Sequence, residues 1–426
     1  MTEKASIAHA DWLKAPDLQR LLGALSGDGE AARVAGGAVR NALLGQAVSD
    51  VDIATTNLPE DTIRRAEAAG FRTVPTGAAH GTVTVISRGK PYEVTTLRAD
   101  IETDGRHAKV VFGRDWTRDA ERRDFTINAL YAEADGRVID LVGGLADIEG
   151  RVLRFIGDPE TRIREDYLRI LRFFRFFAWY GSGRPDAAGL KACARLKEGL
   201  DRLSAERVWS ELKKLLSAPE PARSLLWMRQ SGILSRVLPE TDRWGIDLVH
   251  PLVETEAALG WRPDPLLRIE AMVPPDVERM GSLAERLRLS RAEAERLKRW
   301  AQAETPAADM DGTSLRAAIY RGNRQALVDR LRLALAAARG QAGSDAGVLA
   351  DVARRTRQLD FLEKWTKPVF PIGGSDLSTL GVAAGPAVGR MLRALEKDWI
   401  ASDFSLDRGA LLERAAKLLP EGQGKG

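Results

Sequence analysis

The stretch that decides the fold of the first part of the chain is ARVAGGAVRNALLGQAVSDVDIATT, Ala32 to Thr56. Asp50 and Asp52 are two residues apart in a β-like run, so their carboxylates should face one side of a strand. The apolar residues on either side of Asp52 should face the core. Neighbouring carboxylates repel each other unless a cation lies between them, and oxygen ligands of this kind suit Mg²⁺. The stretch therefore predicts a strand that presents a metal site.

Two glycines and an arginine lie just upstream of these carboxylates. Gly36 and Gly37 allow backbone N–H groups to approach an anion closely, and Arg40 can clamp a phosphate group. An Asp-x-Asp pair alone is a weak signal, but its combination with Gly-Gly-x-x-Arg is much more specific. The chain has neither a Walker lysine loop nor a Gly-x-Gly-x-x-Gly motif, so neither a P-loop nor a dinucleotide site is expected.

The remainder of the chain divides into a mixed part and a helical part. Strand-like runs alternate with helical segments such as 59–69 through the first 150 residues; the runs are 51–53, 82–86, 92–97, 110–112 and 138–141. After Gly157 the strand signals nearly stop. Helix signals follow, among them a Ser290–Glu293 capping box that opens a helix through Ala303, and a helix between Pro221 and Gly232. We expect an α+β chain, in which a head with a mixed sheet and helices precedes an all-α remainder.

Composition restricts the class of protein. Hydrophobic residues make up 44% and charged residues 29% of the 426 residues, which is enough for a packed core. The single cysteine, Cys193, excludes intrachain disulfides and fits a reducing compartment. The N-terminus has no signal-peptide core, and no apolar run approaches the roughly 20 residues of a membrane helix. These features predict a soluble, cytoplasmic protein without a membrane partner.

The charge of the chain is nearly balanced, with 64 Lys and Arg against 60 Asp and Glu, a net of +4. This excess is too small to argue for nucleic-acid binding by itself. Its distribution is more informative, because the segment 151–175, RVLRFIGDPETRIREDYLRILRFFR, has seven arginines and no lysine. Arginine is suited to bidentate phosphate and base contacts. A solvated amphipathic helix is the alternative interpretation of this segment.

Four motifs in order resemble those of a known family. The motifs are GGAVRN, DVD, ERRDFTINAL (121–130) and REDYLRILRFFRF (164–176). They are similar to those of the class II tRNA nucleotidyltransferases, the CCA-adding enzymes and their bacterial poly(A) polymerase relatives, within the polymerase β-like nucleotidyltransferases. The resemblance covers roughly residues 30 to 180 and continues more faintly through 228–240 and 375–389. One departure is Asn41, where the family commonly has Asp; Asn41 is not one of the expected metal ligands.

This resemblance implies roles for the residues of the head. Asp50 and Asp52 would bind two Mg²⁺ ions for in-line phosphoryl transfer from a nucleoside triphosphate to an RNA 3′-hydroxyl. Gly37 and Arg40 would contact the triphosphate. Glu93 is the candidate third carboxylate, with an outward-facing residue of a half-exposed strand as an equally good interpretation. The residues that would meet the ribose and the phosphates are Arg123, Asp124 and Asn128, of which the last two form an i,i+4 pair on an incipient helix.

The arginine-rich segment would select the base. Asp166 and Arg169 lie at i,i+3 and would share a helix face that Arg172 and Arg175 continue. Cytosine and adenine each present an amino donor beside a ring-nitrogen acceptor, whereas uracil and guanine present the reverse pattern. An aspartate that accepts and an arginine that donates therefore match C and A. A buried Asp–Arg ion pair with a structural role is the competing interpretation.

The segment 100–116 coincides with the flexible loop of the family, and its sequence predicts a loop followed by a strand. His107 in this segment is only weakly suggestive of a function. The other histidines, His9, His80 and His250, form no His-Asp hydrolase constellation, so no appended phosphohydrolase domain is expected.

The expected function is template-independent addition of CMP and AMP (CCA) to the 3′ end of tRNA. Its partners would be the tRNA 3′ end, CTP, ATP and Mg²⁺; no protein partner is implied. Alternatives are a poly(A) polymerase of the same family, a partial CC- or A-adding enzyme and, from another class, a catalytically inactive RNA-binding protein. We expect a catalytic head over 1–150, a base-selecting neck over 151–218, a body over 219–310 and a tRNA-binding tail over 311–426.

Overall fold

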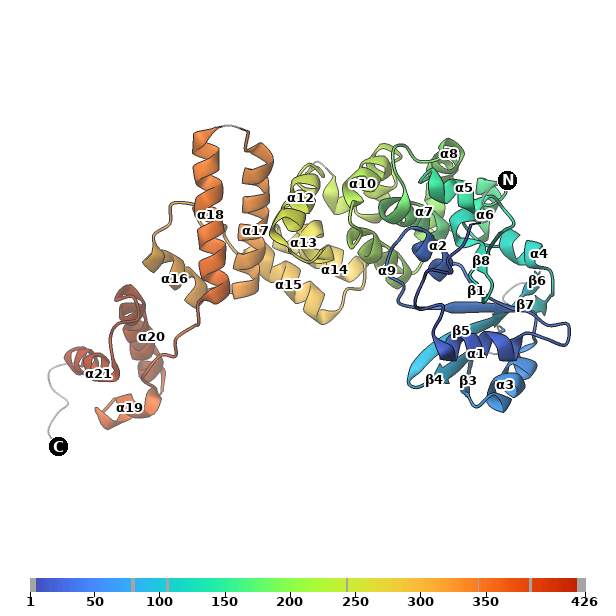
Figure 1. The fold of residues 1–426 in the computed structure, drawn as a ribbon. Helices are drawn as coiled ribbons and strands as arrows, with labels where there is room; N and C mark the ends of the chain where they lie inside the picture. The colour runs from blue at the N-terminus through green and yellow to red at the C-terminus, as the bar shows by residue number, and fades with distance from the viewer. Residues whose placement is uncertain are drawn as a thin grey trace. The chain divides into compact units, whose positions relative to one another are not determined.

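The structure is a computed structural model that describes residues 5–77, 81–104, 107–242, 244–343, 345–382 and 385–419. The chain divides into two compact units, Met1–Val237 and Leu238–Gly426. The first unit holds every strand of the described residues, and the second is helical (Figure 1). This confirms the expected α+β class, a head with a mixed sheet followed by helices. The finer division into head, neck, body and tail stays a prediction.

The core of the first unit is a seven-stranded sheet in the order β3-β4-β5-β2-β1-β8-β9. Strands β2 and β5 are parallel, and the other neighbours in the sheet are antiparallel. Strands β6 and β7 form a separate antiparallel pair. The strands are β1 Ala32–Ala35, β2 Asp52–Thr55, β3 Arg72–Gly77, β4 Thr82–Ser87, β5 Lys90–Thr96, β6 Arg98–Asp104, β7 His107–Phe112, β8 Leu130–Ala132 and β9 Val138–Asp140.

Burial explains which strands the sequence predicted. In β4, buried residues alternate with half-buried ones, which is the pattern of a strand with one face on the core. By contrast, β8 is buried at all three positions and β1 at three of its four, so neither alternates, and neither was predicted. The segment 100–116 was expected to be a loop followed by a strand, but its residues 100–104 belong to β6, which pairs with β7; residues 105 and 106 lie outside the described residues.

Helices cover the sheet and then continue through the first unit. Helices α1 and α3 pack against each other and against strands of the sheet. The helices of this unit are α1 Pro16–Leu25, α2 Gly37–Leu43, α3 Pro59–Ala68, α4 Trp116–Glu121, α5 Gly144–Glu149, α6 Pro159–Glu165, α7 Leu168–Tyr180, α8 Ala187–Arg195, α9 Ala205–Leu216, α10 Pro221–Gln230 and α11 Leu234–Val237, with 3₁₀ helices η2 Thr126–Asn128 and η3 Lys197–Arg202.

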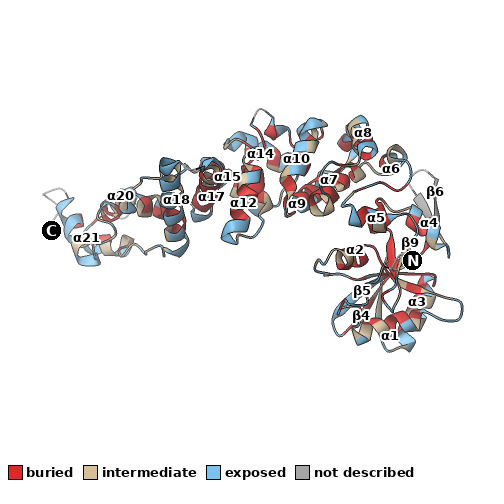
Figure 2. Cartoon of the chain, turned by 45° about the horizontal axis from the view of Figure 1, so that its top comes forward, coloured by how far each residue is buried: buried red, intermediate tan, exposed pale blue. Residues whose placement is uncertain are grey.

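Helix α7 packs against the part of the first unit that contains the sheet through a cluster of aromatic rings. The ring of Phe173, on α7, stacks on Phe155 at 5.4 Å between centroids and lies 6.2 Å from Phe125. Phe176, one turn further along, lies 5.4 Å from Phe125. All four rings are buried, and Figure 2 shows buried residues along α7 and the sheet. The arginine-bearing helix is therefore part of the same core as the strands.

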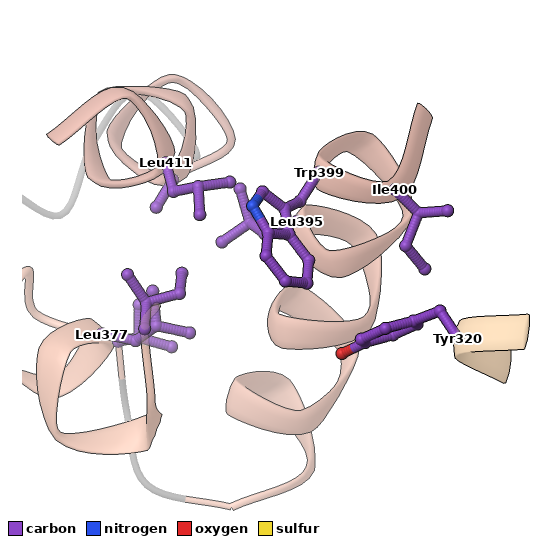
Figure 3. Packing of buried hydrophobic residues seen from close by; sticks show 9 residues of the cluster. Tyr320, Leu377, Leu395, Trp399, Ile400 and Leu411 are labelled. Atoms are coloured by element: carbon purple, nitrogen blue, oxygen red, sulfur yellow. The ribbon is translucent and has the colours of Figure 1, made fainter. Parts of the chain in front are cut away.

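The second unit is built from helices with cores of their own. Figure 3 shows one of these cores, in which Leu377, Leu395, Trp399 and Leu411 come together from α19, α20 and α21 and are joined by Tyr320. The expected capping box of Ser290 and Glu293 is present and opens α15. The helices are η4 Pro239–Thr241, α12 Val249–Leu259, α13 Pro265–Glu270, α14 Val277–Arg286, α15 Arg291–Gln302, α16 Gly312–Arg321, α17 Arg324–Gln341, α18 Ala346–Lys364, α19 Gly374–Thr379, α20 Pro386–Ala401 and α21 Arg408–Lys417.

Within the described ranges, no helix is both long enough and apolar enough to cross a membrane.

Candidate active site

A large polar cavity opens in the first unit. Its volume is about 610 Å³, and we call it the arginine-lined cavity. The lining comes from the start of α2, the first residue of β2, the segment that follows α4, η2, the link between α6 and α7, α7 itself and one residue of α9. The lining residues are Gly36, Gly37, Arg40, Asp52, Arg122, Arg123, Asp124, Asn128, Asp166, Leu168, Arg169, Arg172, Arg175, Phe176 and Arg207.

The cavity gathers most of the residues that the sequence singled out. Of the predicted site residues, only Asp50 and Glu93 lie outside its lining. Seven arginines face three aspartates in this lining, so its formal charge is positive. A cation-rich hollow of this size favours a polyanionic ligand.

The carboxylates lie at the start of β2 and on the neighbouring strand. Asp52 is the first residue of β2 and pairs in register with Glu93 of the parallel strand β5. Both residues line a second, smaller hollow of about 250 Å³, which shares Asp52 with the arginine-lined cavity. Asp50 precedes the strand and is exposed, and one of its oxygens accepts a hydrogen bond from Ser49 Oγ at 2.9 Å. The prediction that one strand carries both aspartates was therefore wrong for Asp50.

Three carboxylates influence one another at this place. Desolvation by the surrounding protein raises the pKa of Asp52, and the charges of Glu93 and Asp50 raise it further, while Arg123 acts in the opposite direction. A raised pKa means that the ionised carboxylate lacks sufficient compensation from the protein alone. A cation would supply that compensation.

Glycine is required at the entrance to α2. Gly36 has φ of 65°, in the left-handed region. A Cβ at this position would lie 3.1 Å from Nη1 of Arg123 and 3.3 Å from the carbonyl oxygen of Asn128. Close approach of two site residues therefore depends on the missing side chain.

Arg40 is buried against the end of α7. Its Nη2 donates to the hydroxyl of Tyr180 at 2.8 Å and to Oδ1 of Asn41 at 2.9 Å, and Nε donates to the same oxygen at 3.1 Å. Nη1 donates to Oδ1 of Asn128. The guanidinium carbon also lies 4.1 Å from the ring centroid of Tyr180, a cation–π contact.

Asp124 and Asn128 meet as predicted, but not on an α-helix. Thr126–Asn128 is a 3₁₀ turn, and Asp124 precedes it. Nδ2 of Asn128 donates to Oδ1 of Asp124 at 3.0 Å, and Arg172 donates to Oδ2 from both Nε and Nη2. Burial alone would raise the pKa of Asp124, but Arg172 and the hydrogen bonds lower it below its usual range. This carboxylate is fully engaged within the protein, so a ribose contact would require one of these bonds to be exchanged.

Arg123 is held by a carboxylate that the sequence did not single out. Its Nη2 donates to Oδ2 of Asp119 at 3.2 Å, and the hydroxyl of Tyr131 donates to the same oxygen at 2.8 Å. Arg122 binds Oδ1 of Asp119 at 3.1 Å. Asp119 thus orients two arginines of the cavity at once.

Asp166 and Arg169 line the cavity from a break between two helices. The expected single helix is interrupted, because α6 ends at Glu165, Asp166 has an extended backbone, and α7 begins at Leu168. The two residues do not share a helix face, which corrects the prediction, although both still line the cavity.

The competing interpretation was an ion pair between Asp166 and Arg169, but the structure has two other pairs instead. Oδ2 of Asp166 accepts from Nη2 of Arg207 at 2.7 Å, and Nη1 of Arg169 donates to Oε2 of Glu165 at 2.5 Å. Neither Asp166 nor Arg169 is buried, so the alternative of a buried structural pair between them is wrong.

Several residues that line or support the cavity were not identified from the sequence. Arg207 and Glu211 come from α9, and Glu211 accepts from Nε of Arg175 at 2.6 Å. Arg207 is 41 residues from its partner Asp166, and no local spacing connects them. Arg122 lies within the predicted motif 121–130, and Tyr180 lies four residues after the motif 164–176, so these motifs were the available signal for the two residues.

The two histidines whose side chains the structure describes, His9 and His250, are not part of the cavity lining. His9 is exposed, and Nε2 of His250 lies 3.4 Å from Oε1 of Glu254 in the second unit. His80 and the side chain of His107 fall outside the described residues.

Comparisons with known proteins agree with this geometry. Residues 32–154 match the family described as "Poly A polymerase head domain", and residues 186–244 match "Probable RNA and SrmB- binding site of polymerase A". The chain is 34% identical over 387 residues to the mitochondrial CCA tRNA nucleotidyltransferase 1 of Danio rerio, covering 89% of this chain and 86% of that protein. It is also 43% identical over 203 residues to the CCA-adding enzyme of Streptococcus gordonii, covering 47% of this chain and 49% of that enzyme.

Solved structures show the same similarity. The CCA-adding enzyme of Bacillus stearothermophilus in complex with CTP has a TM-score of 0.69 and 27% identity, covering 94% of this chain and 97% of the other. The fold is also that of the Thermotoga maritima CCA-adding enzyme, with a TM-score of 0.67 and 21% identity, covering 97% of this chain and 98% of the other. Fold and cavity thus define a nucleotidyltransferase. Within that class, the chain belongs to the family of the CCA-adding tRNA nucleotidyltransferases and poly(A) polymerases.

Proposed function

We propose that this chain adds CMP and AMP to the 3′ end of tRNA without a nucleic-acid template and releases pyrophosphate. The observation that carries the proposal is the arginine-lined cavity, with Asp52 in its lining and Glu93 beside Asp52. Arginines suit the triphosphate, and carboxylates beside them suit a metal-assisted transfer. In this reaction the RNA 3′-hydroxyl attacks the α-phosphate of CTP or ATP, and the β- and γ-phosphates leave together.

Members of the family are generally metal-dependent, and the residues of this chain fit Mg²⁺ as part of its coordination. Among the residues that the structure describes, no three His, Cys, Asp or Glu side chains come together as metal ligands. Magnesium in phosphoryl-transfer sites typically uses one or two carboxylates and completes its shell with water and substrate phosphates. Asp50 and Asp52 would hold the two Mg²⁺ ions, with Glu93 next to Asp52. When bound, Mg²⁺ would neutralise charge on the phosphates and favour deprotonation of the 3′-hydroxyl.

The other predicted residues would position the nucleotide. Gly37 and Arg40 would contact the triphosphate, while Arg123, Asp124 and Asn128 would frame the ribose and phosphates. Asp166 and Arg169 would read the base edge, supported by the presence of both residues in the cavity lining. Glu165 and Arg207, which bind Arg169 and Asp166, would hold these two side chains in place.

The test uses pure protein, Mg²⁺ and tRNA transcripts that end in the discriminator base, in C or in CC, each with one NTP at a time. We expect CTP to extend the first two transcripts and ATP to extend the third by one nucleotide. Extension of any 3′ end with many A residues would identify a poly(A) polymerase. Extension of only some of the transcripts would identify a partial enzyme. Binding of tRNA with no incorporation would identify an inactive RNA-binding protein.

The compartment is a separate proposal. We infer a cytoplasmic location from the single, buried and unpaired cysteine, Cys193, which fits a reducing environment. The relative from Danio rerio is named as mitochondrial. Fractionation of cells that express the tagged chain distinguishes the two compartments.

A further inference from the structure

Three arginines of the cavity lie around one aromatic ring. Phe176 is on α7 and lines the arginine-lined cavity, with an exposed fraction of only 5%. The guanidinium carbon of Arg175 lies 4.0 Å from the centroid of this ring, and those of Arg40 and Arg172 both lie 5.3 Å from it. These distances are within the range of cation–π contacts, which extends to about 6 Å. The ring is thus the place where an arginine of α2 meets two arginines of α7.

The charges of these arginines repel one another. Desolvation lowers the pKa of Arg40, and the charge of Arg175 lowers it further. Desolvation also lowers the pKa of Arg175, and the charge of Arg172 acts in the same direction. Neighbouring carboxylates and the hydroxyl of Tyr180 oppose these shifts, but the pKa of both arginines stays below the ordinary value. The group therefore needs contacts that keep its members together.

Carboxylates balance part of this charge. Asp124 accepts from Nε and Nη2 of Arg172 at 2.8 and 2.5 Å, and its charge also acts on Arg40. Glu211 accepts from Nε of Arg175 at 2.6 Å. Two carboxylates against three guanidinium groups leave an excess of positive charge beside the ring, which suits a polyanionic ligand.

An aromatic ring can hold cations close together without neutralising them. Its π face carries a partial negative charge that attracts a guanidinium group, but the ring has no net charge. An acid in the same place would remove the positive excess, and an aliphatic side chain would not attract the cations. The ring of Phe176 is itself held by packing, because its centroid lies 5.4 Å from that of Phe125 and 5.8 Å from that of Tyr180.

We propose that Phe176 is a positioning residue, whose ring holds Arg40, Arg172 and Arg175 together so that their combined charge faces the polyphosphate of the bound nucleotide. The inference rests on the proposed function, because it assumes that a nucleoside triphosphate occupies the cavity. It gives a role in binding to an uncharged side chain that also belongs to the aromatic core. The experiment therefore has to separate this role from packing.

The first test compares two buried rings of α7. Phe176→Leu keeps an apolar side chain and removes the π face. Phe173→Leu removes a ring that stacks on Phe155 and lies outside the cavity lining. None of the cation–π contacts of the described residues involves Phe173. Both substitutions should lower the melting temperature, because each replaces a buried ring by a smaller side chain.

The probe is inorganic pyrophosphate in Mg²⁺ buffer, measured by calorimetry on the full chain. We expect its dissociation constant to rise about tenfold in Phe176→Leu, equivalent to about 1.4 kcal/mol, the order of one or two cation–π contacts. Phe173→Leu should bind pyrophosphate as wild type does. Equal dissociation constants in the two variants would overturn the proposal, because packing would then account for the whole effect of the ring.

A second pair of variants changes the electron distribution of the ring and hardly its shape, so the fold is retained. Fluorine atoms withdraw electron density from the π face and weaken its attraction for cations. We expect trifluorophenylalanine in place of Phe176 to weaken pyrophosphate binding, and the same replacement of Phe173 to leave it unchanged. Wild-type affinity after the replacement of Phe176, or an equal loss at both positions, would contradict the role of the ring.

These outcomes are separable from failure of the proposed function. If wild-type protein adds no nucleotide to any tRNA transcript, the proposed function is wrong. If it adds CCA, and Phe176→Leu binds pyrophosphate as Phe173→Leu does, only the inference about Phe176 is wrong.

Discussion

Asp52 is a carboxylate whose ionised form is poorly compensated by the protein, because desolvation, Glu93 and Asp50 all raise its pKa. A group in this condition contributes little to folding at neutral pH and is available for a cation. A substitution of Asp52 should therefore abolish activity without lowering the stability of the fold.

We expect Asp52→Asn to abolish nucleotide addition while leaving the melting temperature unchanged or slightly higher, because the substitution removes a metal ligand and also a repulsive charge. Asp50→Asn should likewise abolish addition. The measurements are incorporation of labelled CMP into tRNA and thermal unfolding. Asp61→Asn is the control, because Asp61 pairs only with Arg64 on the surface of α3 and such pairs contribute little. Near-normal turnover in either site variant would show that the metal site is elsewhere.

Base selection should also depend on individual side chains, those of Asp166 and Arg169. Asp166→Ala should weaken discrimination against UTP and GTP, because the carboxylate that repels their carbonyl oxygens is removed. Arg169→Ala should lower kcat/KM for CTP and ATP together. Sites that hydrogen-bond a substrate can reject analogues by about 10⁴-fold or more, so a lost partner should be visible in these ratios.

The control for both variants is Arg164→Ala, which removes an exposed ion pair with Glu160 on α6. Lower activity on every nucleotide with unchanged ratios would assign Asp166 and Arg169 to structure instead of selection.

Site residues could be predicted where they lie close to one another in the sequence, and not where their partners are far away along the chain. Gly37, Arg40, Asp124 and Asn128 lie in short motifs whose chemistry is readable locally, and all four line the cavity. Arg207 and its contact with Asp166 could not be predicted, because the packing of α9 on α7 brings the two residues together. The break between α6 and α7 could not be predicted from the sequence either, because the spacing of apolar residues is helical on both sides of it.

At the scale of elements, prediction succeeded where a strand or helix carries its own signal. Helix α3 begins at Pro59 with two acidic residues in its first turn, and α15 has its capping box. Strands β1 and β8 could not be predicted, because they are short and almost entirely buried. β1 is a strand because it pairs with β2 and β8, and β8 because it pairs with β1 and β9, and no local pattern reveals these partners.

Helix α13 of the second unit ends in a buried acid. Glu270 is 2% exposed, and neither of its oxygens has a hydrogen-bond partner. Burial raises its pKa well above 4.5, the charges of Asp329 and Asp264 raise it further, and Arg296 and Arg330 oppose the shift. The folded unit therefore retains a proton on Glu270 that the unfolded chain releases.

A raised folded-state pKa contributes stability that is fully present below pH 4.5 and is lost as the pH rises towards the folded value. Relative to Glu270→Gln, the wild type should lose up to about 1.4 kcal/mol of unfolding free energy for each pH unit in that window. Urea unfolding of the second unit between pH 4 and pH 9 measures the difference, with Glu285→Gln, on the surface of α14, as the control. Parallel curves for wild type and Glu270→Gln would contradict the prediction.

At the scale of the whole chain, the two compact units define where it can be cut. A chain that ends at Val237 keeps every residue of the arginine-lined cavity and also α10, which packs on α7. Ser224 of α10 donates from Oγ to the carbonyl of Phe174 at 2.7 Å. A chain that ends near Ala218 would lose this support.

We expect the chain cut after Val237 to bind CTP but to lose most of its tRNA affinity, because phosphate contacts should be spread over the later helices. The chain cut after Ala218 should unfold more easily and bind CTP less well. Filter binding of tRNA against salt concentration, together with CTP calorimetry, measures both effects. An affinity and a salt slope equal to those of the full chain would place the tRNA contacts in the first unit.

Separate cores in the two units have a calorimetric consequence. Heating should give two endotherms, because a chain of two units does not unfold as one two-state system. CTP bound in the cavity at 100 times its Kd would add about 2.7 kcal/mol to the stability of Met1–Val237 and nothing to Leu238–Gly426, so only one endotherm should move. Each unit holds five of the ten tryptophans, so tryptophan fluorescence would report both unfolding transitions in one curve. The shift of its apparent melting temperature on CTP binding would therefore be smaller than the shift of the first unit alone.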